Sequence, residues 1–83
     1  MNNSISVFPN PTNGNVKVTL TMPKEGDYKL SVSDVLGRTM FTDDIHITST
    51  YSGNIDMSGY SKGIYFISVK DGSFLAVKKV VVY

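Results

Sequence analysis

The segment spanning residues 63–83 places the strongest constraint on how this chain can fold. It contains two runs of apolar and β-branched residues, separated by the pair Asp71-Gly72. Asp-Gly between two such runs is typical of a β-hairpin, because a type I′ turn needs positive φ angles that these residues tolerate. A two-residue turn at this place predicts that Lys70 lies opposite Ser73.

The same register assigns the two faces of the hairpin. It places Ile67 opposite Ala76, on the side that we expect to face the core together with Tyr65. Neighbouring residues of a strand point to opposite faces, so Lys78 and Lys79 cannot both point to solvent in a regular strand. One of them must point inward, or lie at a bulge or at the rim of the sheet.

Shorter segments with alternating apolar residues precede this hairpin. Pro9 ends the first of them and has no backbone N–H to donate, which predicts an edge strand. Met40 is the expected inward residue of the fourth segment, and the fifth is either a short strand or an extended crossover. The segments are residues 5–8, 16–22, 28–33, 38–42, 43–50 and 51–57.

This pattern predicts an all-β fold, since no stretch repeats apolar residues at helical spacing. About seven short strands with frequent turn signals are typical of an immunoglobulin-like antiparallel β-sandwich. A tyrosine near the start of a late strand, here Tyr60 or Tyr65, is typical of the same fold. The 83 residues suffice for one domain, in which we expect residues 1–4 to be linker.

Composition argues against several classes of protein. A net charge of +1 without a basic stripe gives no reason to expect nucleic acid as a partner. The absence of cysteine excludes disulfides and thiolate metal sites, and it suits an oxidising compartment. No apolar run approaches the ~18 residues of a membrane-spanning helix, and the first residues lack the apolar core of a signal peptide.

Catalytic chemistry has little support in the sequence. The single histidine, His46, lies between two isoleucines on the polar side of a weak strand, where a surface position is expected. Catalysis would require it to lie in a cleft beside Asp43, Asp44 or Asp56. Two adjacent carboxylates without a third ligand do not define a cation site. We therefore expect no catalytic residue, no metal and no cofactor.

The nine aromatic residues leave a carbohydrate-binding or adhesion module as the alternative function. Such a module would present a row of exposed aromatic rings on one face of a sheet. Tyr28, Tyr65 and Phe74 lie at positions expected to face the core, and the chain has no tryptophan. The residues alone therefore indicate a small β-sandwich and do not choose its function.

Five motifs, in order, resemble the C-terminal sorting domain of type IX secretion system cargo from Gram-negative bacteria. The resemblance covers residues 5 to 83, and one departure is Tyr60, where many members of the family carry leucine. The motifs are VFPNPTNG at residues 7–14, SDVLGR at 33–38, IDMS at 55–58, GIYF at 63–66 and KKVVV at 78–82.

The resemblance implies an immunoglobulin-like sandwich that serves as a non-catalytic secretion signal. Such a domain follows an N-terminal cargo domain that reaches the periplasm, where the outer-membrane translocon recognises the folded signal. A sortase-like protease then commonly removes it, and the cargo stays at the cell surface or is released. Its oligomeric state is left open.

The resemblance also implies which residues matter for sorting. Most of them fit turns, corners or the core, whereas Arg38, Lys78 and Lys79 are the expected contacts with the translocon, because no turn or core requires their charge. The motif positions are Pro9, Asn10, Pro11, Gly14, Asp34, Gly37, Arg38, Gly63, Tyr65, Lys78, Lys79, Val80, Val81 and Val82.

A sorting signal that a translocon recognises can present a strand edge instead of a pocket. Residues 76–83 form a long apolar strand which, if it lies at an edge, could pair with a receptor or with a second copy. On this hypothesis, deletion of residues 80–83 abolishes export, and normal export of a truncated chain that remains folded would refute it.

Overall fold

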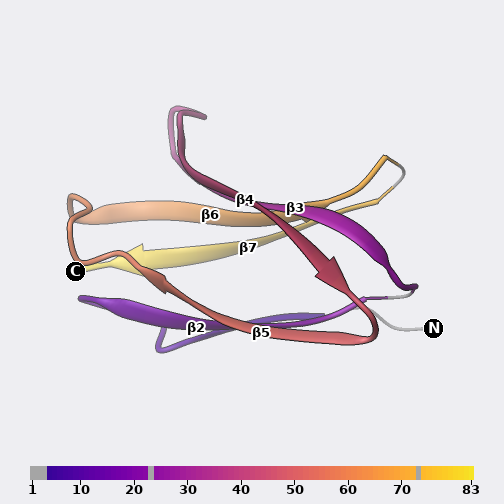
Figure 1. Cartoon of the computed structure of the whole chain (residues 1–83). Helices are drawn as coiled ribbons and strands as arrows, with labels where there is room; N and C mark the ends of the chain where they lie inside the picture. Colours follow the sequence, from indigo (N-terminus) through magenta and orange to yellow (C-terminus); the bar gives the residue numbers. More distant parts are fainter. Residues whose placement is uncertain (1–3, 23, 73) are drawn as a thin grey trace.

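A computed structural model describes residues 4–22, 24–72 and 74–83. These residues form seven strands and no helix, and the strands are arranged in two layers (Figure 1). The strands are β1 (Ser4–Phe8), β2 (Asn15–Thr21), β3 (Gly26–Asp34), β4 (Thr39–Ile47), β5 (Thr50–Asp56), β6 (Gly63–Lys70) and β7 (Leu75–Val82).

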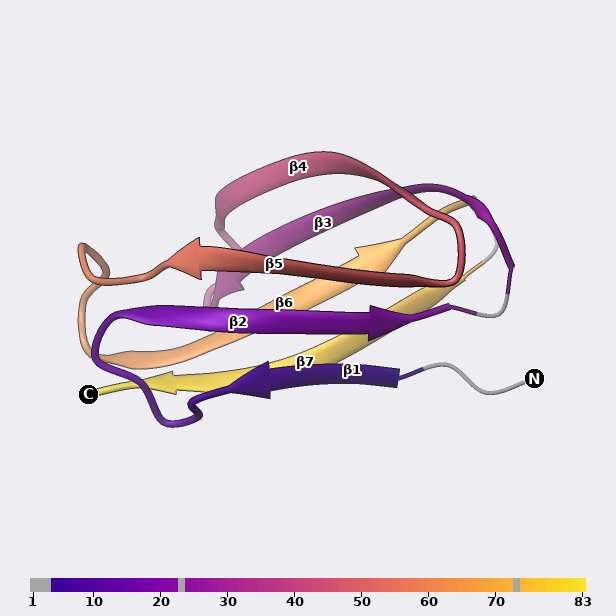
Figure 2. The ribbon, with the colours of Figure 1, turned by 60° about the horizontal axis from the view of Figure 1, so that its bottom comes forward.

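Each layer is an antiparallel sheet. One sheet has the order β1-β2-β5 and the other has the order β4-β3-β6-β7. Figure 2 shows that β1 and β7, which are the edge strands of the two sheets, run along the same side of the sandwich. The architecture confirms the expected immunoglobulin-like β-sandwich, and the position of β1 confirms the expected edge strand.

The core lies between the two sheets and is built from alternate residues of the strands. β2 contributes Val16, Val18 and Leu20, none of which is exposed. β6 contributes Ile67 and Val69 from the opposite sheet, and both are fully buried as well. Since side chains of a strand alternate between its faces, the polar residues between these positions point away from the core.

Two expectations about the middle of the chain need correction. Residues 43–47 do not form a separate element, because they continue β4, in which Ile45 and Ile47 are buried. Met40 does not point inward and is 43% exposed. Its strand pairs Phe41 with Val32 but Thr39 with Ser33, so Met40 is the extra residue of a β-bulge.

Ser4, expected in the linker, belongs to β1, and residues 1–3 lie outside the described part of the chain.

The C-terminal hairpin is present, but its predicted register is wrong by two residues. Lys70 lies opposite Leu75 and not opposite Ser73, a residue outside the described part of the chain. The Asp71 N–H donates to the carbonyl oxygen of Phe74 at 3.0 Å, which joins the two sides of the hairpin next to its turn. The half-buried Phe74 ring packs edge-on against Tyr28 with ring centroids 6.4 Å apart, so the turn contributes to the core.

A shift of two residues keeps every side chain on its predicted face. Lys78 now lies opposite the buried Ile67, on the core-facing side of the sheet, while Lys79 lies opposite Phe66 on the outer side. The register of β6 and β7 is continuous, without a bulge. Lys78 is nevertheless exposed, because β7 is an edge strand and its ammonium group can reach solvent around the rim.

Candidate functional site

The loop that follows β1 is paired with the end of β7, although the two are far apart in the sequence. The side-chain amide of Asn10 donates from Nδ2 to the Lys79 carbonyl oxygen at 2.9 Å. Its Oδ1 accepts the Val81 N–H at 3.1 Å. The amide thus offers one donor and one acceptor to the edge of β7, as the backbone of a neighbouring strand would.

Thr12 extends this pairing with its backbone. Its N–H donates to the Val81 carbonyl oxygen at 2.9 Å, and its carbonyl oxygen accepts the Tyr83 N–H at 2.9 Å. Its hydroxyl group accepts the Gly14 N–H at 3.1 Å and donates to the Asn15 carbonyl oxygen at 3.3 Å. Thr12 is only 2% exposed, so the loop is fixed by a buried and fully partnered side chain.

These contacts join the first and last sorting motifs into one structural unit. Pro9 and Pro11, which lack an N–H, flank Asn10, and the peptide bonds that precede the two prolines are cis. The Gly14 carbonyl oxygen accepts the Met57 N–H at 3.2 Å, which also ties the loop to the motif at residues 55–58. We call residues 9–14 together with residues 79–83 the clasp.

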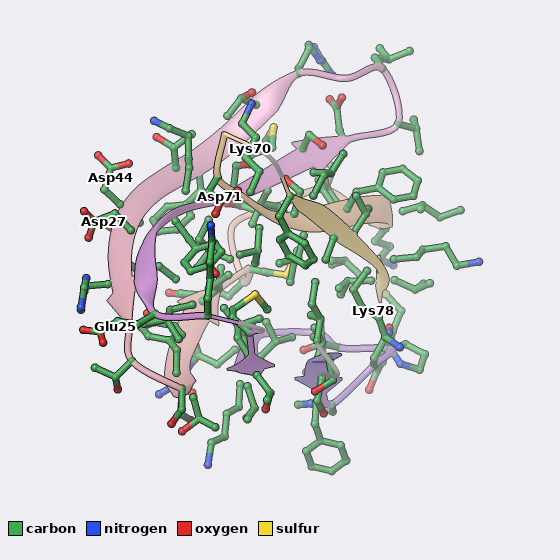
Figure 3. All side chains as sticks on the ribbon, turned by 90° about the vertical axis from the view of Figure 1, so that its right-hand side faces the viewer. Glu25, Asp27, Asp44, Lys70, Asp71 and Lys78 are labelled. Atoms are coloured by element: carbon green, nitrogen blue, oxygen red, sulfur yellow. The ribbon has the colours of Figure 1, made fainter. Side chains whose placement is uncertain are left out.

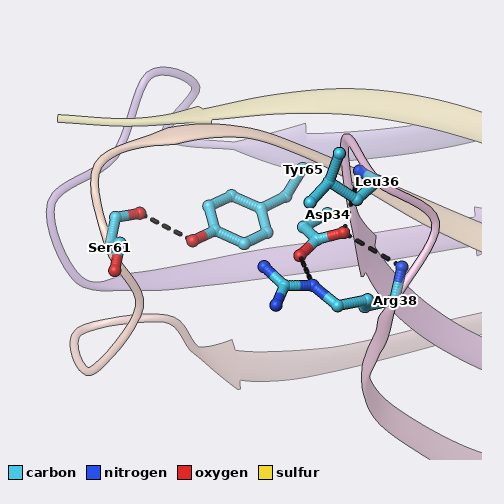
Figure 4. A network of polar contacts seen from close by, with 5 residues as sticks. All are labelled: Asp34, Leu36, Arg38, Ser61 and Tyr65. Atoms are coloured by element: carbon cyan, nitrogen blue, oxygen red, sulfur yellow. Dashed lines mark hydrogen bonds and ion pairs between the residues drawn. The ribbon is translucent and has the colours of Figure 1, made fainter.

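The second motif forms the turn between β3 and β4. The Gly37 N–H donates to the Asp34 carbonyl oxygen at 3.0 Å, and Gly37 has a φ of +83°. Asp at the first and Gly at the fourth position are typical of a type I turn. The Asp34 carboxylate accepts the N–H groups of Leu36 at 2.9 Å and Arg38 at 3.0 Å (Figure 4).

Arg38 has a structural partner that sequence reasoning missed. Its Nε lies 2.7 Å from Oδ2 of Asp34, while 73% of its side chain remains exposed. Burial acts to raise the pKa of the Asp34 carboxyl, but hydrogen bonds from Arg38 and Leu36 outweigh it and hold the pKa below its usual value. The positive charge is therefore used inside this turn, and a contact between Arg38 and the translocon remains a prediction.

The fourth motif packs directly beside the second. Tyr65 on β6 lies opposite Asp34 on β3, and its hydroxyl group donates to the Ser61 carbonyl oxygen at 2.7 Å (Figure 4). A buried tyrosine near the start of a strand, bonded to backbone a few residues upstream, is the tyrosine corner of immunoglobulin-like domains. Tyr65 takes this role, and Tyr60 packs against it with ring centroids 5.2 Å apart.

The last motif divides into a buried part and an exposed part. Val80 is fully buried and Val82 is 5% exposed, so these two residues belong to the core. Val81 is half-buried and uses its backbone in the clasp. Lys78 and Lys79 are exposed. Of the predicted positions, these two lysines are the ones whose charge has no described structural use.

Comparison with known families matches this arrangement. A family model described as the secretion system C-terminal sorting domain covers residues 6–83. The chain belongs to this family. A search of curated proteins finds no match. As a sorting domain of the type IX system, it directs export across the outer membrane, toward the cell surface or the medium.

The histidine of the sorting domain lies at the surface but has partners that the sequence did not suggest. His46 Nδ1 lies 2.8 Å from Oδ1 of Asp27, and its Nε2 lies 3.2 Å from Oε2 of Glu25. Neither carboxylate belongs to the residues that were expected beside it, Asp43, Asp44 and Asp56. Asp27 is the residue opposite His46 in the pairing of β3 with β4. Finding this pair requires the register of β3 against β4, which the alternation of apolar residues does not give.

Replacing Asp27 with asparagine should lower the pKa of His46. Hydrogen bonds from His46 to Asp27 and to Glu25 hold its pKa above the usual 6.5. Because the folded-state pKa is raised, the stabilisation is complete below the unfolded pKa and is lost as the pH rises through the folded pKa. NMR titration of the imidazole protons measures the change. The variant Asp43→Asn is the control and should leave the titration unchanged; equal curves for the wild type and Asp27→Asn would contradict the prediction.

Replacing Asn10 with alanine should loosen the clasp. The variant loses both side-chain hydrogen bonds to β7, which are worth about 1–2 kcal/mol together in the free energy of unfolding. Urea denaturation measures this loss, and hydrogen exchange should become faster at the amide of Val81. Asn13→Ala, in the same loop, is the matched control. A stability equal to that of the control would show that the amide of Asn10 does not hold β7.

Other kinds of site have no support in the part of the chain that the structure describes. It contains no group of three or more His, Cys, Asp or Glu side chains arranged to hold a metal ion. It also has no helix with the length and apolar character needed to cross a membrane. The exposed aromatic residues Phe8, Phe41 and Tyr83 come from different parts of the sandwich and do not form a row.

One hollow of about 470 Å³ lies away from the sorting motifs. Its walls carry opposite charges, including an ion pair between Lys29 and Asp44 with Nζ and Oδ1 3.4 Å apart. None of the predicted sorting positions lines it. Its lining residues are Asp27, Tyr28, Lys29, Asp44, Lys70 and Asp71.

Proposed function

We propose that this domain is a non-catalytic secretion signal that the outer-membrane translocon of the type IX system recognises in the periplasm. The clasp is the observation that carries the proposal. Asn10 and Thr12 reach β7 across nearly the whole chain, so the first and last motifs meet only after folding. A receptor that binds the clasp therefore recognises a folded domain and not a linear peptide.

The placement of the other motif positions supports recognition through a surface. Asp34, Gly37 and Tyr65 stabilise a turn and a corner through their hydrogen bonds. Both ring nitrogens of His46 are occupied by carboxylates, and no nucleophile is bonded to it among the described residues. A role for a sortase-like protease follows from the family: the protease would cut before β1, where the cargo joins the sandwich.

An export assay tests the proposed function. Residues 1–83 are fused to the C-terminus of a periplasmic fluorescent reporter, in a host with an intact type IX system and in a translocon mutant. We expect the reporter at the surface or in the medium of the intact host only. The reporter without the domain is the control. Retention of a folded fusion in the periplasm of both hosts would refute the proposal.

The same fusion tests removal of the signal. Mass spectrometry of the exported reporter should show a product that ends before Ser4, so that the whole β-sandwich has been released. An exported reporter that still carries β1–β7 would show export without cleavage by the sortase-like protease.

A further inference from the structure

The outer edge of β7 is covered over only part of its length. In an antiparallel pair, alternate residues direct both backbone groups toward the same neighbouring strand. Val81 directs its N–H and carbonyl groups away from β6 and into the clasp. By the same alternation, Leu75 and Val77 direct theirs away from β6. In the described part of the chain no strand pairs with this side of β7, and the clasp begins only at the Lys79 carbonyl oxygen.

Apolar side chains line the outer face beside this open stretch. Leu75 is 63% exposed and Val77 is 53% exposed, and both point away from the core. On β6, Phe66 lies opposite Lys79 and is half-buried on the same face. An exposed apolar edge strand is a template for pairing with another chain. We call residues 75–79 the open edge.

Two lysines, Lys78 and Lys79, give the open edge a positive charge. Lys78 lies on its inner face and Lys79 on its outer face, and Lys70 is opposite Leu75. Figure 3 shows Lys78 on the opposite side of the domain from Glu25, Asp27 and Asp44, with Asp71 between them at the turn. Asp44 lies on β4, the opposite edge strand of the sheet, whereas Lys70 lines the same hollow as Asp27 and Asp44.

We propose that the open edge binds an extended acidic segment of the secretion machinery as an additional β-strand, an inference that rests on the proposed function. The backbone groups of Val77 and the N–H of Lys79 pair with that segment. Its acidic side chains face Lys78 and Lys79, and apolar side chains next to them along the segment cover Leu75 and Val77. Backbone pairing supplies affinity, and the charges supply specificity.

A second copy of the domain fits this edge less well. Self-pairing would bring Lys78 and Lys79 of both copies together in one short stretch, where like charges destabilise a sheet. A charged residue on the inner face of an edge strand is also a feature that prevents such pairing. An acidic partner turns the same two lysines into favourable contacts.

The open edge replaces residues 80–83 as the place to test strand addition. Val77→Pro removes the outward N–H without touching a hydrogen bond to β6, and proline is tolerated on edge strands. Val77→Thr keeps that N–H and is its matched control. In the export assay we expect Val77→Pro to reduce the exported fraction of the reporter by roughly tenfold or more, and Val77→Thr to have a much smaller effect.

A charge-reversal pair gives a second, independent variant. Lys78→Glu with Lys79→Glu places negative charge at the open edge and should reduce export by a similar factor. Lys17→Glu with Lys62→Glu changes the net charge by the same amount at exposed lysines elsewhere and should be exported normally. Circular dichroism and thermal melting of each purified fusion establish that it is folded.

The outcomes separate this inference from the proposed function. Export of the wild type, with loss in both folded variants and not in their controls, supports the open edge as the binding surface. Normal export of a folded Val77→Pro or of the folded charge-reversal variant overturns it and leaves the sorting function intact. Failure of the wild type to be exported removes both. A wild-type dimer that Val77→Pro converts to a monomer would make a second copy the partner and overturn the acidic segment.

Discussion

Deletion of residues 80–83 is expected to unfold the domain. It removes Val80 and Val82, which are buried in the core, and leaves Thr12 without its partners on β7. Burying two such side chains contributes about 3–6 kcal/mol. The whole stability of a domain of this size is roughly 4–12 kcal/mol. Thermal denaturation followed by circular dichroism should therefore show no cooperative transition, or one far below that of the full chain.

Tyr83→Ala is the matched control for this deletion. Tyr83 is 63% exposed, and the substitution keeps its backbone N–H and the bond to Thr12. A truncated chain that melts cooperatively near the temperature of this control would contradict the expectation. If the truncated chain is unfolded, its failure to be exported does not identify a recognition surface. The deletion that sequence reasoning favoured thus cannot separate a lost signal from a lost fold.

Ile67→Ala is expected to give the largest loss of stability among single substitutions in the C-terminal hairpin. Ile67 is fully buried in the centre of the four-stranded sheet, where a cavity forms because the surrounding side chains relax only in part. Such substitutions cost about 2–5 kcal/mol in the free energy of unfolding. Urea denaturation measures this cost, and the slope of the free energy of unfolding against urea concentration should be unchanged.

Val77→Ala in the neighbouring strand is the control for this prediction. Val77 is 53% exposed on the outer face, so its truncation should cost no more than about 0.5 kcal/mol. Similar costs for the two substitutions would show that β6 and β7 do not present the faces described here.

The fold was largely predictable because the alternation of apolar and polar residues along a strand indicates directly which residues face the core. It placed the apolar residues Val16, Val18 and Leu20 correctly, and it predicted Tyr65 and Ile67 on the inner face. Alternation has a period of two, so it cannot distinguish registers that differ by two residues. That is why the hairpin register was wrong while its faces were right.

Met40 was misplaced for a different reason. A bulge inserts one residue and reverses the alternation beyond it, and nothing in residues 38–42 indicates where that residue lies. The pairing of Asp34 with Arg38, in contrast, joins residues of the same turn, and their opposite charges were visible in the sequence.

The clasp could not be predicted from the residues alone. Its hydrogen bonds join Asn10 to Lys79 and Val81, and no local rule links a side-chain amide to a strand that is so distant in the sequence. The resemblance to a family drew attention to both motifs but did not say that they touch. The contact of His46 with Glu25 and Asp27 was missed in the same way, since it depends on how β3 and β4 are paired.

The clasp also makes the signal depend on the synthesis of residues 79–83. A ribosome makes residues 9–14 long before residues 79–83, so a nascent chain cannot assemble the unit that joins Asn10 to Lys79 and Val81. A cargo protein that is cut short within β7, or clipped there by a protease, lacks the same unit. If the translocon recognises the clasp, as proposed above, only molecules in which residues 79–83 have been made and folded present the signal, and the sorting step would act as quality control over the cargo.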